Sequence, residues 1–236
     1  MKSLLASVGL MWIASFGTMA TVAQAGDGPV VVELYTSQGC SSCPPADALL
    51  HKLAKDRDVI ALALHVDYWD YIGWKDQFAD PAYTTRQRGY ARAANARTIY
   101  TPQMVIGGKD HVIGNRPNEV SAALQSHMAK TDVAVIEASR SGRNVQISGQ
   151  ALKSLRGNLI VQIVEYTPSQ TVAIKRGENA GRTLEYSNVV SRWDTVGTWN
   201  GRGELSMSAR LTSNGPAAVI VQRADHGEII AAAHVN

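Results

Sequence analysis

Apolar runs and helical patterns alternate along the first half of the chain. Residues 30–35 and 59–67 are apolar runs rich in β-branched side chains, and such runs predict buried strands. Between them, Leu49, Leu50 and Leu53 have the spacing of the apolar face of a helix. A strand, a helix and a second strand in this order predict a parallel pair with a right-handed crossover.

The pattern after the second strand predicts one helix, two strands and a closing helix. Residues 68–78 are rich in aromatic side chains, and Asp80 followed by Pro81 is typical of a helix start. The helix is expected to run to about residue 97. The later elements are predicted as strands over 103–106 and 111–113 and a helix over 117–130.

From residue 132 the pattern changes to short apolar runs separated by Gly, Asn, Ser and Pro. Evenly spaced strands with turn residues between them predict a β sandwich. The predicted domains are therefore an α/β domain over 26–131 and a sandwich-like domain over 132–236. The strands predicted for the second domain are 133–138, 144–149, 159–166, 171–174, 188–193, 203–209, 217–222 and 229–234.

Residues 1–25 have the pattern of a secretory signal peptide. Lys2 gives a positive start, residues 4–20 are largely apolar, and Ala23-Gln24-Ala25 is a small-x-small cleavage pattern. An uncleaved membrane anchor is the alternative, and the short apolar core disfavours it. The sequence therefore predicts a periplasmic or secreted protein without a stable membrane anchor after cleavage.

Composition and charge exclude some classes of partner. The 236 residues are 45% hydrophobic and carry a formal charge of only +3, which is an ordinary globular balance without the basic excess of a nucleic-acid-binding protein. The sequence contains no G-x-S-x-G, no H-E-x-x-H and no phosphate-binding glycine loop. Hydrolase and nucleotide-binding functions therefore have no support.

The two cysteines, Cys40 and Cys43, lie between the first predicted strand and the first helix. At a helix N-terminus, free amides and the helix dipole favour the thiolate and lower a cysteine pKa. Disulfides persist in an exported protein, but a bridge across two residues constrains the unfolded chain little. The pair predicts a working dithiol. Cys40, expected to be the more exposed, is the nucleophile, and Cys43 resolves the mixed disulfide.

Three motifs resemble a family of secreted bacterial proteins that carries only a domain-of-unknown-function label. They are ELYTSQGCSSCPPAD at 33–47, HVDYWDYIGW at 65–74 and YTPQM at 100–104, and the resemblance covers essentially the whole mature chain. The order of elements around the cysteines also resembles the thioredoxin fold. The resemblance implies an exported protein with an α/β thioredoxin-like domain, followed here by the sandwich-like domain. It supplies no established activity.

The thioredoxin resemblance also implies roles for individual residues. Thr101 and Pro102 stand where that fold has a cis-proline loop beside the cysteines, and with Gly39 they are the predicted substrate-binding residues. Gly39 replaces a Trp of the thioredoxin pattern, and Ser41-Ser42 replace Gly-Pro, so the direction of electron flow stays open. Pro44 is expected to move Cys43 away from helical dihedrals.

Glu33 and His65 are further candidates, each with two interpretations. Glu33 matches the buried acid of thioredoxin-like enzymes with one extra residue before the cysteines. There a raised pKa would let it take the proton of Cys43, or it is an edge carboxylate facing water. His65 and Asp67 end the second strand, at the edge where open α/β sheets place their sites. For His65 a buried, hydrogen-bonded histidine is the favoured interpretation.

These observations favour an exported thiol–disulfide oxidoreductase that acts on protein or small-molecule thiols and disulfides and needs no cofactor. The alternative is a binding module: a carrier of a soft metal such as Cu(I), held by the same thiols, or a non-catalytic thioredoxin-like module. Zinc with four ligands is disfavoured, because no second cysteine pair exists. The oligomeric state stays open.

Overall fold

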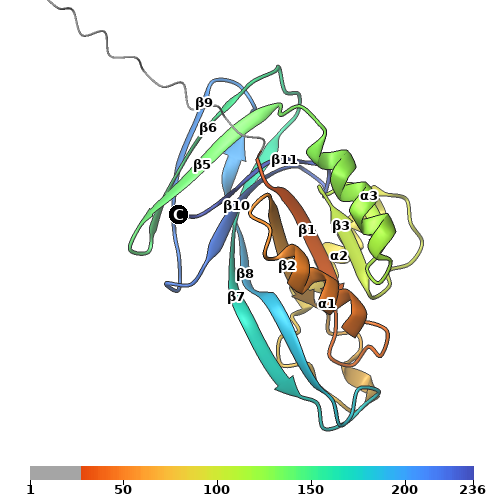
Figure 1. Cartoon of the computed structure of the whole chain (residues 1–236). Helices are drawn as coiled ribbons and strands as arrows, with labels where there is room; N and C mark the ends of the chain where they lie inside the picture. Colours follow the sequence, from red (N-terminus) through yellow and green to blue (C-terminus); the bar gives the residue numbers. More distant parts are fainter. Residues whose placement is uncertain (1–27) are drawn as a thin grey trace, which may run out of the picture.

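The computed structural model describes residues 28–236, and in it the chain is a mixed α/β structure with two sheets. The larger sheet has eight strands in the order β11-β10-β7-β8-β2-β1-β3-β4, and the smaller has three in the order β5-β6-β9 (Figure 1). The predicted signal peptide, residues 1–25, lies outside the described residues. Within 28–236, no helix is long and apolar enough to cross a membrane.

The first half of the chain forms one end of the large sheet, with helices on both faces. β1 pairs in parallel with β2 and antiparallel with β3. Because side chains alternate along β1, Val32 and Leu34 pack with α1 and α3, whereas Val31 and Tyr35 pack with α2. The elements are β1 (Val30–Thr36), α1 (Pro44–Leu53), β2 (Val59–His65), α2 (Pro81–Ala93), β3 (Gln103–Ile106), β4 (Asp110–Ile113) and α3 (Pro117–Met128).

The second half continues the same sheet and adds a second layer. β7 (Leu159–Ala173) and β8 (Thr183–Trp199) form a hairpin, and β8 meets β2 in parallel at Ala63 and Val189. β10 (Ala217–Arg223) and β11 (Ile229–His234) extend the sheet beyond β7. The second layer shares an apolar cluster with this part of the large sheet. Its strands are β5 (Ala134–Ser141), β6 (Asn144–Ala151) and β9 (Glu204–Arg210).

The predicted domain boundary near residue 131 falls between α3 and β5, and the large sheet crosses it. Strands from both sides of the boundary are hydrogen-bonded neighbours in that sheet. In the second half, the small sheet therefore packs on strands of the same large sheet that contains β1 and β2. A division into two folding units stays a prediction.

The β7–β8 hairpin is longer than its sequence pattern predicts. Strands predicted over 159–166 and 171–174 are one strand of 15 residues, and the strand predicted over 188–193 is part of a strand of 17. The distal part is ordered because Val172 and Tyr186 are buried in a separate cluster that also contacts Trp74. This length carries residues 174–182, called the hairpin tip below, toward the end of the molecule where β1 ends (Figure 1).

Candidate dithiol site

The cysteine pair lies where β1 ends and α1 begins. α1 begins at Pro44, where a missing amide costs nothing, and Cys43 is the N-cap residue. The expectation that Pro44 moves Cys43 out of helical dihedrals is wrong, since Cys43 has φ −80° and ψ −34°. Its carbonyl accepts the amides of Ala46 and Asp47 at 2.8 and 3.1 Å. Cys43 therefore caps α1 while it has helical dihedrals itself.

Cys40 and Cys43 form a disulfide with an Sγ–Sγ distance of 2.11 Å. Both cysteines are 0% exposed, although Ser41 and Ser42 between them are exposed. The prediction that Cys40 is the more exposed sulfur is therefore wrong for this oxidised state. A reactant reaches either sulfur only after the covering residues move.

The first part of the cover is the aromatic segment 69–74, which contains the short helix η1 (Asp70–Ile72). A Cβ on Gly39 would lie 3.1 Å from Ile72 Cδ1 and 3.2 Å from Trp69 Cβ, so a larger residue here would force segment 69–74 to shift. Trp74 Nε1 donates to Gln38 Oε1 at 2.8 Å. The glycine that departs from the thioredoxin pattern thus has a steric cause.

The second part of the cover is the hairpin tip. Asn179, which is 1% exposed, donates from Nδ2 to the carbonyls of Gln38 at 2.9 Å and Cys40 at 3.0 Å. Glu178 accepts the amide of Ser41 at 3.2 Å. Asn179 and Cys40 are 139 positions apart, so no local sequence pattern points to this contact.

Glu33 is fully buried, so the edge-carboxylate interpretation is wrong. It accepts hydrogen bonds from Arg86 Nε and Nη2 at 2.7 and 2.8 Å, and from the hydroxyls of Tyr35 and Tyr90. This network lies on the α2 face of the sheet, whereas the cysteine-bearing α1 covers the opposite face. The role of proton acceptor for Cys43 therefore has no support from the position of Glu33, because neighbouring side chains alternate between faces.

Residues 37–43, between β1 and α1, are called the cysteine loop below. Two other carboxylates, Asp47 and Asp76, lie beneath this loop. Asp47 is 5% exposed and accepts the Thr36 hydroxyl at 2.8 Å. Burial raises the pKa of Asp47 to about 7, and the interactions with His65 and the Thr36 hydroxyl offset only part of that rise. Asp76 accepts His65 Nδ1 at 2.7 Å and the amide of Gln38 at 2.8 Å. The prediction of a buried, hydrogen-bonded His65 is confirmed.

Sequence reasoning missed both of these carboxylates. For Asp47 a signal existed, because it stands one helical turn after Cys43 in a predicted helix. For Asp76 none did, since it comes from an irregular segment. Asp67, at the end of the same strand as His65, instead accepts the hydroxyl of Thr84 from α2.

Thr101 and Pro102 lie beside the cysteine loop, and the peptide bond between them is cis. Trp69 Nε1 donates to Thr101 Oγ1 at 2.7 Å, and the same tryptophan packs against Gly39. A Cβ on Gly114 would meet Ala46 Cβ at 3.1 Å and Pro102 Cβ at 3.3 Å, so the loop borders the first turn of α1. The structure thus gathers most predicted site residues and leaves Glu33 apart. Those gathered are Gly39, Cys40, Cys43, Thr101 and Pro102.

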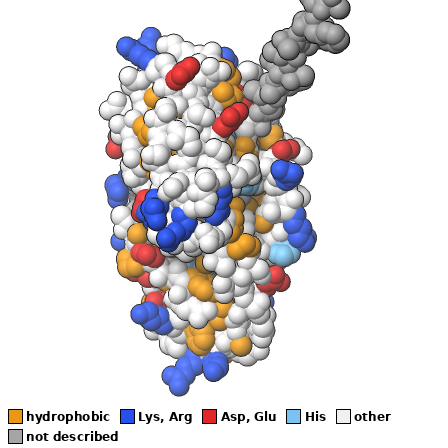
Figure 2. Space-filling model, turned by 90° about the vertical axis from the view of Figure 1, so that its left-hand side faces the viewer, with side chains coloured by type: hydrophobic (Ala, Val, Ile, Leu, Met, Phe, Trp, Pro, Cys, Tyr) orange, Lys and Arg blue, Asp and Glu red, His pale blue; other side chains and the backbone are white. Residues whose placement is uncertain are grey.

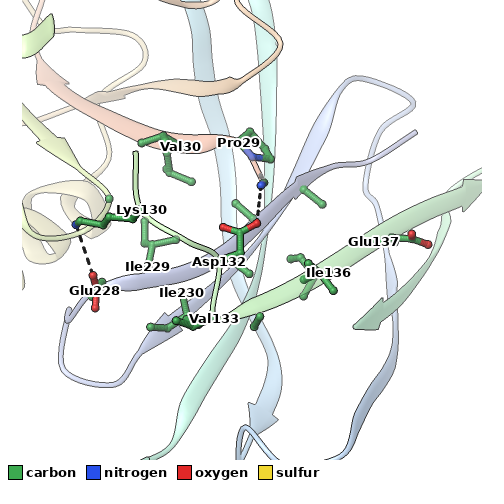
Figure 3. A pocket seen from close by; sticks show the side chains of 18 of the residues that line it. Pro29, Val30, Lys130, Asp132, Val133, Ile136, Glu137, Glu228, Ile229 and Ile230 are labelled. Carbon is green, nitrogen blue, oxygen red and sulfur yellow. Dashed lines mark hydrogen bonds and ion pairs between the residues drawn. The ribbon is translucent and has the colours of Figure 1, made fainter. Parts of the chain in front are cut away.

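A pocket of about 890 Å³ lies away from the cysteine loop, between the start of β1, residues 130–139 and β11 (Figure 3). Two of its polar side chains already have partners: Asp132 accepts the amide of Gly28 at 3.0 Å, and Lys130 pairs with Glu228 at 3.8 Å. No lining residue belongs to the cysteine loop, to segment 69–74 or to the hairpin tip. The pocket therefore does not serve chemistry at the sulfurs.

Neither the charge on the face shown in Figure 2 nor the placement of metal-ligating side chains in residues 28–236 indicates a second site. On the face shown in Figure 2, basic and acidic side chains are interspersed, without a wide region of one sign. Among the side chains of residues 28–236, no three His, Cys, Asp or Glu are placed to hold a metal ion together. The cysteine loop is therefore the site that the remaining argument concerns.

Comparisons with known proteins identify relatives but no activity. The family described as "Protein of unknown function (DUF1223)" matches residues 31–222. The crystal structure of protein AGR_C_4864 from Agrobacterium tumefaciens is 32% identical, with a TM-score of 0.76 over 89% of this chain and 94% of that chain. HBP35 of Porphyromonas gingivalis is 13% identical, with a TM-score of 0.62 over 88% and 74%, which shows a likeness of fold alone. Among curated proteins, none matches.

Proposed function

The chain belongs to the DUF1223 family, whose function is unknown, and from its cysteine loop we propose that it is an exported thiol–disulfide oxidoreductase with a covered cysteine pair. The observation that carries the proposal is the Cys40–Cys43 disulfide at the N-terminus of α1. A helix N-terminus favours the thiolate that exchange requires. The proposed substrates are protein or small-molecule disulfides, and no cofactor is needed.

A purely structural role is a weaker explanation of the disulfide. Chain-entropy arguments give a bridge across so short a loop about 2 kcal/mol, the low end of the usual range. The surrounding β1, β2 and α1 already bury an apolar core that includes Leu34, Leu50 and Ala63. Stability alone therefore gives little reason for a bridge at this position.

The arrangement of elements around the loop supports a thioredoxin-like first half. The strand order β2-β1-β3-β4, with α1 and α3 on one face and α2 on the other, agrees with that expectation. In this interpretation Thr101 and Pro102 hold the substrate backbone, and Gly39 contacts the substrate once segment 69–74 has moved away from it. Their positions next to Trp69 support the assignment.

The proposed exchange begins when the cover opens on the reduced protein. The Cys40 thiolate attacks a substrate disulfide, forms a mixed disulfide and releases one substrate thiolate. Cys43, after losing its proton, attacks the Cys40 sulfur and releases the second substrate thiolate. The substrate disulfide is thereby reduced to two thiols, and the cysteine pair is oxidised to the disulfide seen here.

Trapping tests the proposal directly. Incubation of the reduced Cys43→Ser variant with glutathione disulfide is expected to leave glutathione on Cys40, visible by intact-protein mass spectrometry. Equilibration of the wild type with glutathione buffers gives the potential of the pair. A disulfide that no glutathione buffer reduces in the folded protein, together with no trapped adduct, contradicts the proposal.

The Asn179→Ala variant is expected to be reduced faster by a small thiol, by about tenfold at pH 7. The substitution removes two hydrogen bonds that hold the hairpin tip on the cysteine loop, and about 1.4 kcal/mol of lost cover stability corresponds to a factor of ten. Stopped-flow reduction by dithiothreitol measures the rate. Asn118→Ala, on the exposed start of α3, is the matched control. An unchanged rate would show that the hairpin tip does not limit access.

A further inference from the structure

Unpartnered buried polar atoms concentrate beneath the cysteine loop. Of the five buried side-chain atoms without a hydrogen-bond partner in the described part of the chain, four belong to this region and the fifth is Trp199 Nε1. Buried polar groups in proteins are normally paired, so a cluster of exceptions calls for an explanation. The four atoms are Gln38 Nε2, Asp47 Oδ2, His65 Nε2 and Tyr186 OH.

Two of these side chains, Gln38 and His65, are joined through Asp76. Asp76 Oδ2 lies 2.7 Å from His65 Nδ1 and accepts the Gln38 amide, whereas the opposite ring atom of His65, Nε2, has no partner. The ring of Tyr186 packs edge-on to His65 at 4.9 Å between centroids. Because His65 follows Ala61 and Ala63 along β2 in alternation, it faces α1, and Asp47 of α1 faces the sheet, where it contacts Thr36.

Asp47 is the member of this group nearest to Cys43 along the helix. It lies one turn after Cys43, and its amide donates to the Cys43 carbonyl at 3.1 Å. Side chains of a helix lean toward its N-terminus, so a residue at i+4 leans toward residue i. One carboxylate oxygen is held by Thr36, which leaves the other available.

We propose that Asp47, held by the Thr36 hydroxyl, takes the proton of the Cys43 thiol during exchange. This inference rests on the proposed oxidoreductase function. The Cys43 S–H bond breaks and the proton moves to the Asp47 carboxylate, which becomes a neutral acid. The Cys43 thiolate then attacks Cys40 and releases the substrate thiolate, and Asp47 later gives its proton to solvent when the cover is open.

Several titratable or polar groups face Asp47 from the elements packed around it. The pH dependence of mixed-disulfide closure therefore reflects these groups together and not Asp47 alone. Glu33 and Arg86 lie on the opposite face of the sheet and are not members. The members are Cys43 and the more exposed His51 on α1, Thr36 on β1, His65 on β2, Asp76 from the segment before α2, and Tyr186 on β8, with Arg182 of the hairpin tip nearby.

The test separates attack from resolution. In the Cys43→Ser background, Asp47→Asn is expected to leave the rate of glutathione capture by Cys40 within twofold. With both cysteines present, Asp47→Asn is expected to slow closure of the mixed disulfide at pH 7 more than tenfold. The His65→Gln variant is expected to move the pH profile of this closure to higher pH, because the interaction with His65 lowers the pKa of Asp47. The surface variant Asp58→Asn makes the same charge change and is the control.

The outcomes distinguish the two proposals. If Cys43→Ser captures no glutathione, the oxidoreductase function itself fails. If capture occurs and Asp47→Asn closes its mixed disulfide at the wild-type rate, the function stands and the role of Asp47 is overturned. Thr36→Val keeps the carboxylate, so it tests the role if Asp47→Asn does not fold: loss of the hydroxyl is expected to move the closure profile to higher pH, and an unmoved profile overturns the proposal.

A stability measurement reads the same group without any activity. The folded pKa of Asp47, about 7, lies above its ordinary value of 3.8, so the folded state binds the extra proton between these values. The stability that Asp47 contributes is therefore fully present below about pH 3.8 and is lost as pH rises to about 7. Asp47→Asn is expected to lose this fall in urea unfolding, whereas Asp58→Asn retains it. A wild type and an Asp47→Asn variant with identical pH dependence would contradict a buried, protonatable Asp47.

Discussion

The Glu33→Gln variant is expected to unfold with a free energy about 3–5 kcal/mol below that of the wild type, because it leaves the charge of Arg86 without its partner. The guanidinium is largely buried: it pairs with Glu33 and stacks over Trp193 at 3.8 Å. For a chain of this length such a loss lowers Tm by roughly 6–20 °C. Urea unfolding followed by tryptophan fluorescence measures the effect.

The same variant decides between a structural and a catalytic Glu33. Because the carboxylate lies across the sheet from α1, thiol–disulfide exchange well below Tm is expected to keep its wild-type rate. Glu137→Gln, on an exposed strand position, is the control and should change stability by less than about 0.5 kcal/mol. Lost exchange with unchanged stability would instead support Glu33 as the proton acceptor for Cys43, the role that its sequence position suggests.

The fate of Glu33 shows where sequence reasoning reaches its limit. Its burial could have been predicted from its place in an apolar strand, but a partner 53 positions away could not. A thioredoxin-like motif fixes the distance of an acid from the cysteines along the chain, and one extra residue sends that side chain to the other face. The acid beneath the loop is instead Asp47, whose helical spacing from Cys43 was readable.

The first half of the fold was predictable because its signals are local. Apolar runs over 30–35 and 59–67, and the Asp80-Pro81 start, each specify an element within a few residues. The cover of the cysteines depends instead on a hairpin whose distal strands are stabilised by Trp74 and Phe78 from the other half. Exposure of Cys40 was therefore mispredicted, since the residues that bury it are distant in sequence.

The Cys40→Ser variant is expected to lose all measurable exchange while remaining folded. A serine hydroxyl cannot form the mixed disulfide, so both insulin reduction and glutathione capture should fall to the uncatalysed rate. Loss of the short bridge costs about 2 kcal/mol, or a Tm lower by roughly 4–8 °C. Insulin turbidity, intact-protein mass spectrometry and thermal unfolding measure the three quantities on one preparation.

The contrast with the neighbouring variants identifies the nucleophile. Cys43→Ser loses the same bridge and the same stability, yet it should still capture glutathione on Cys40, whereas Ser41→Ala, whose side chain is exposed, should behave as the wild type. Capture by Cys40→Ser at Cys43 would exchange the two roles. Equal stability losses with no capture by either variant would show that the disulfide has only a structural role at the start of α1. Loss of exchange can thus be measured apart from loss of stability at this loop. Because a bridge this short contributes little to the free energy of unfolding, either serine variant stays folded and its exchange rate can be compared with that of the wild type.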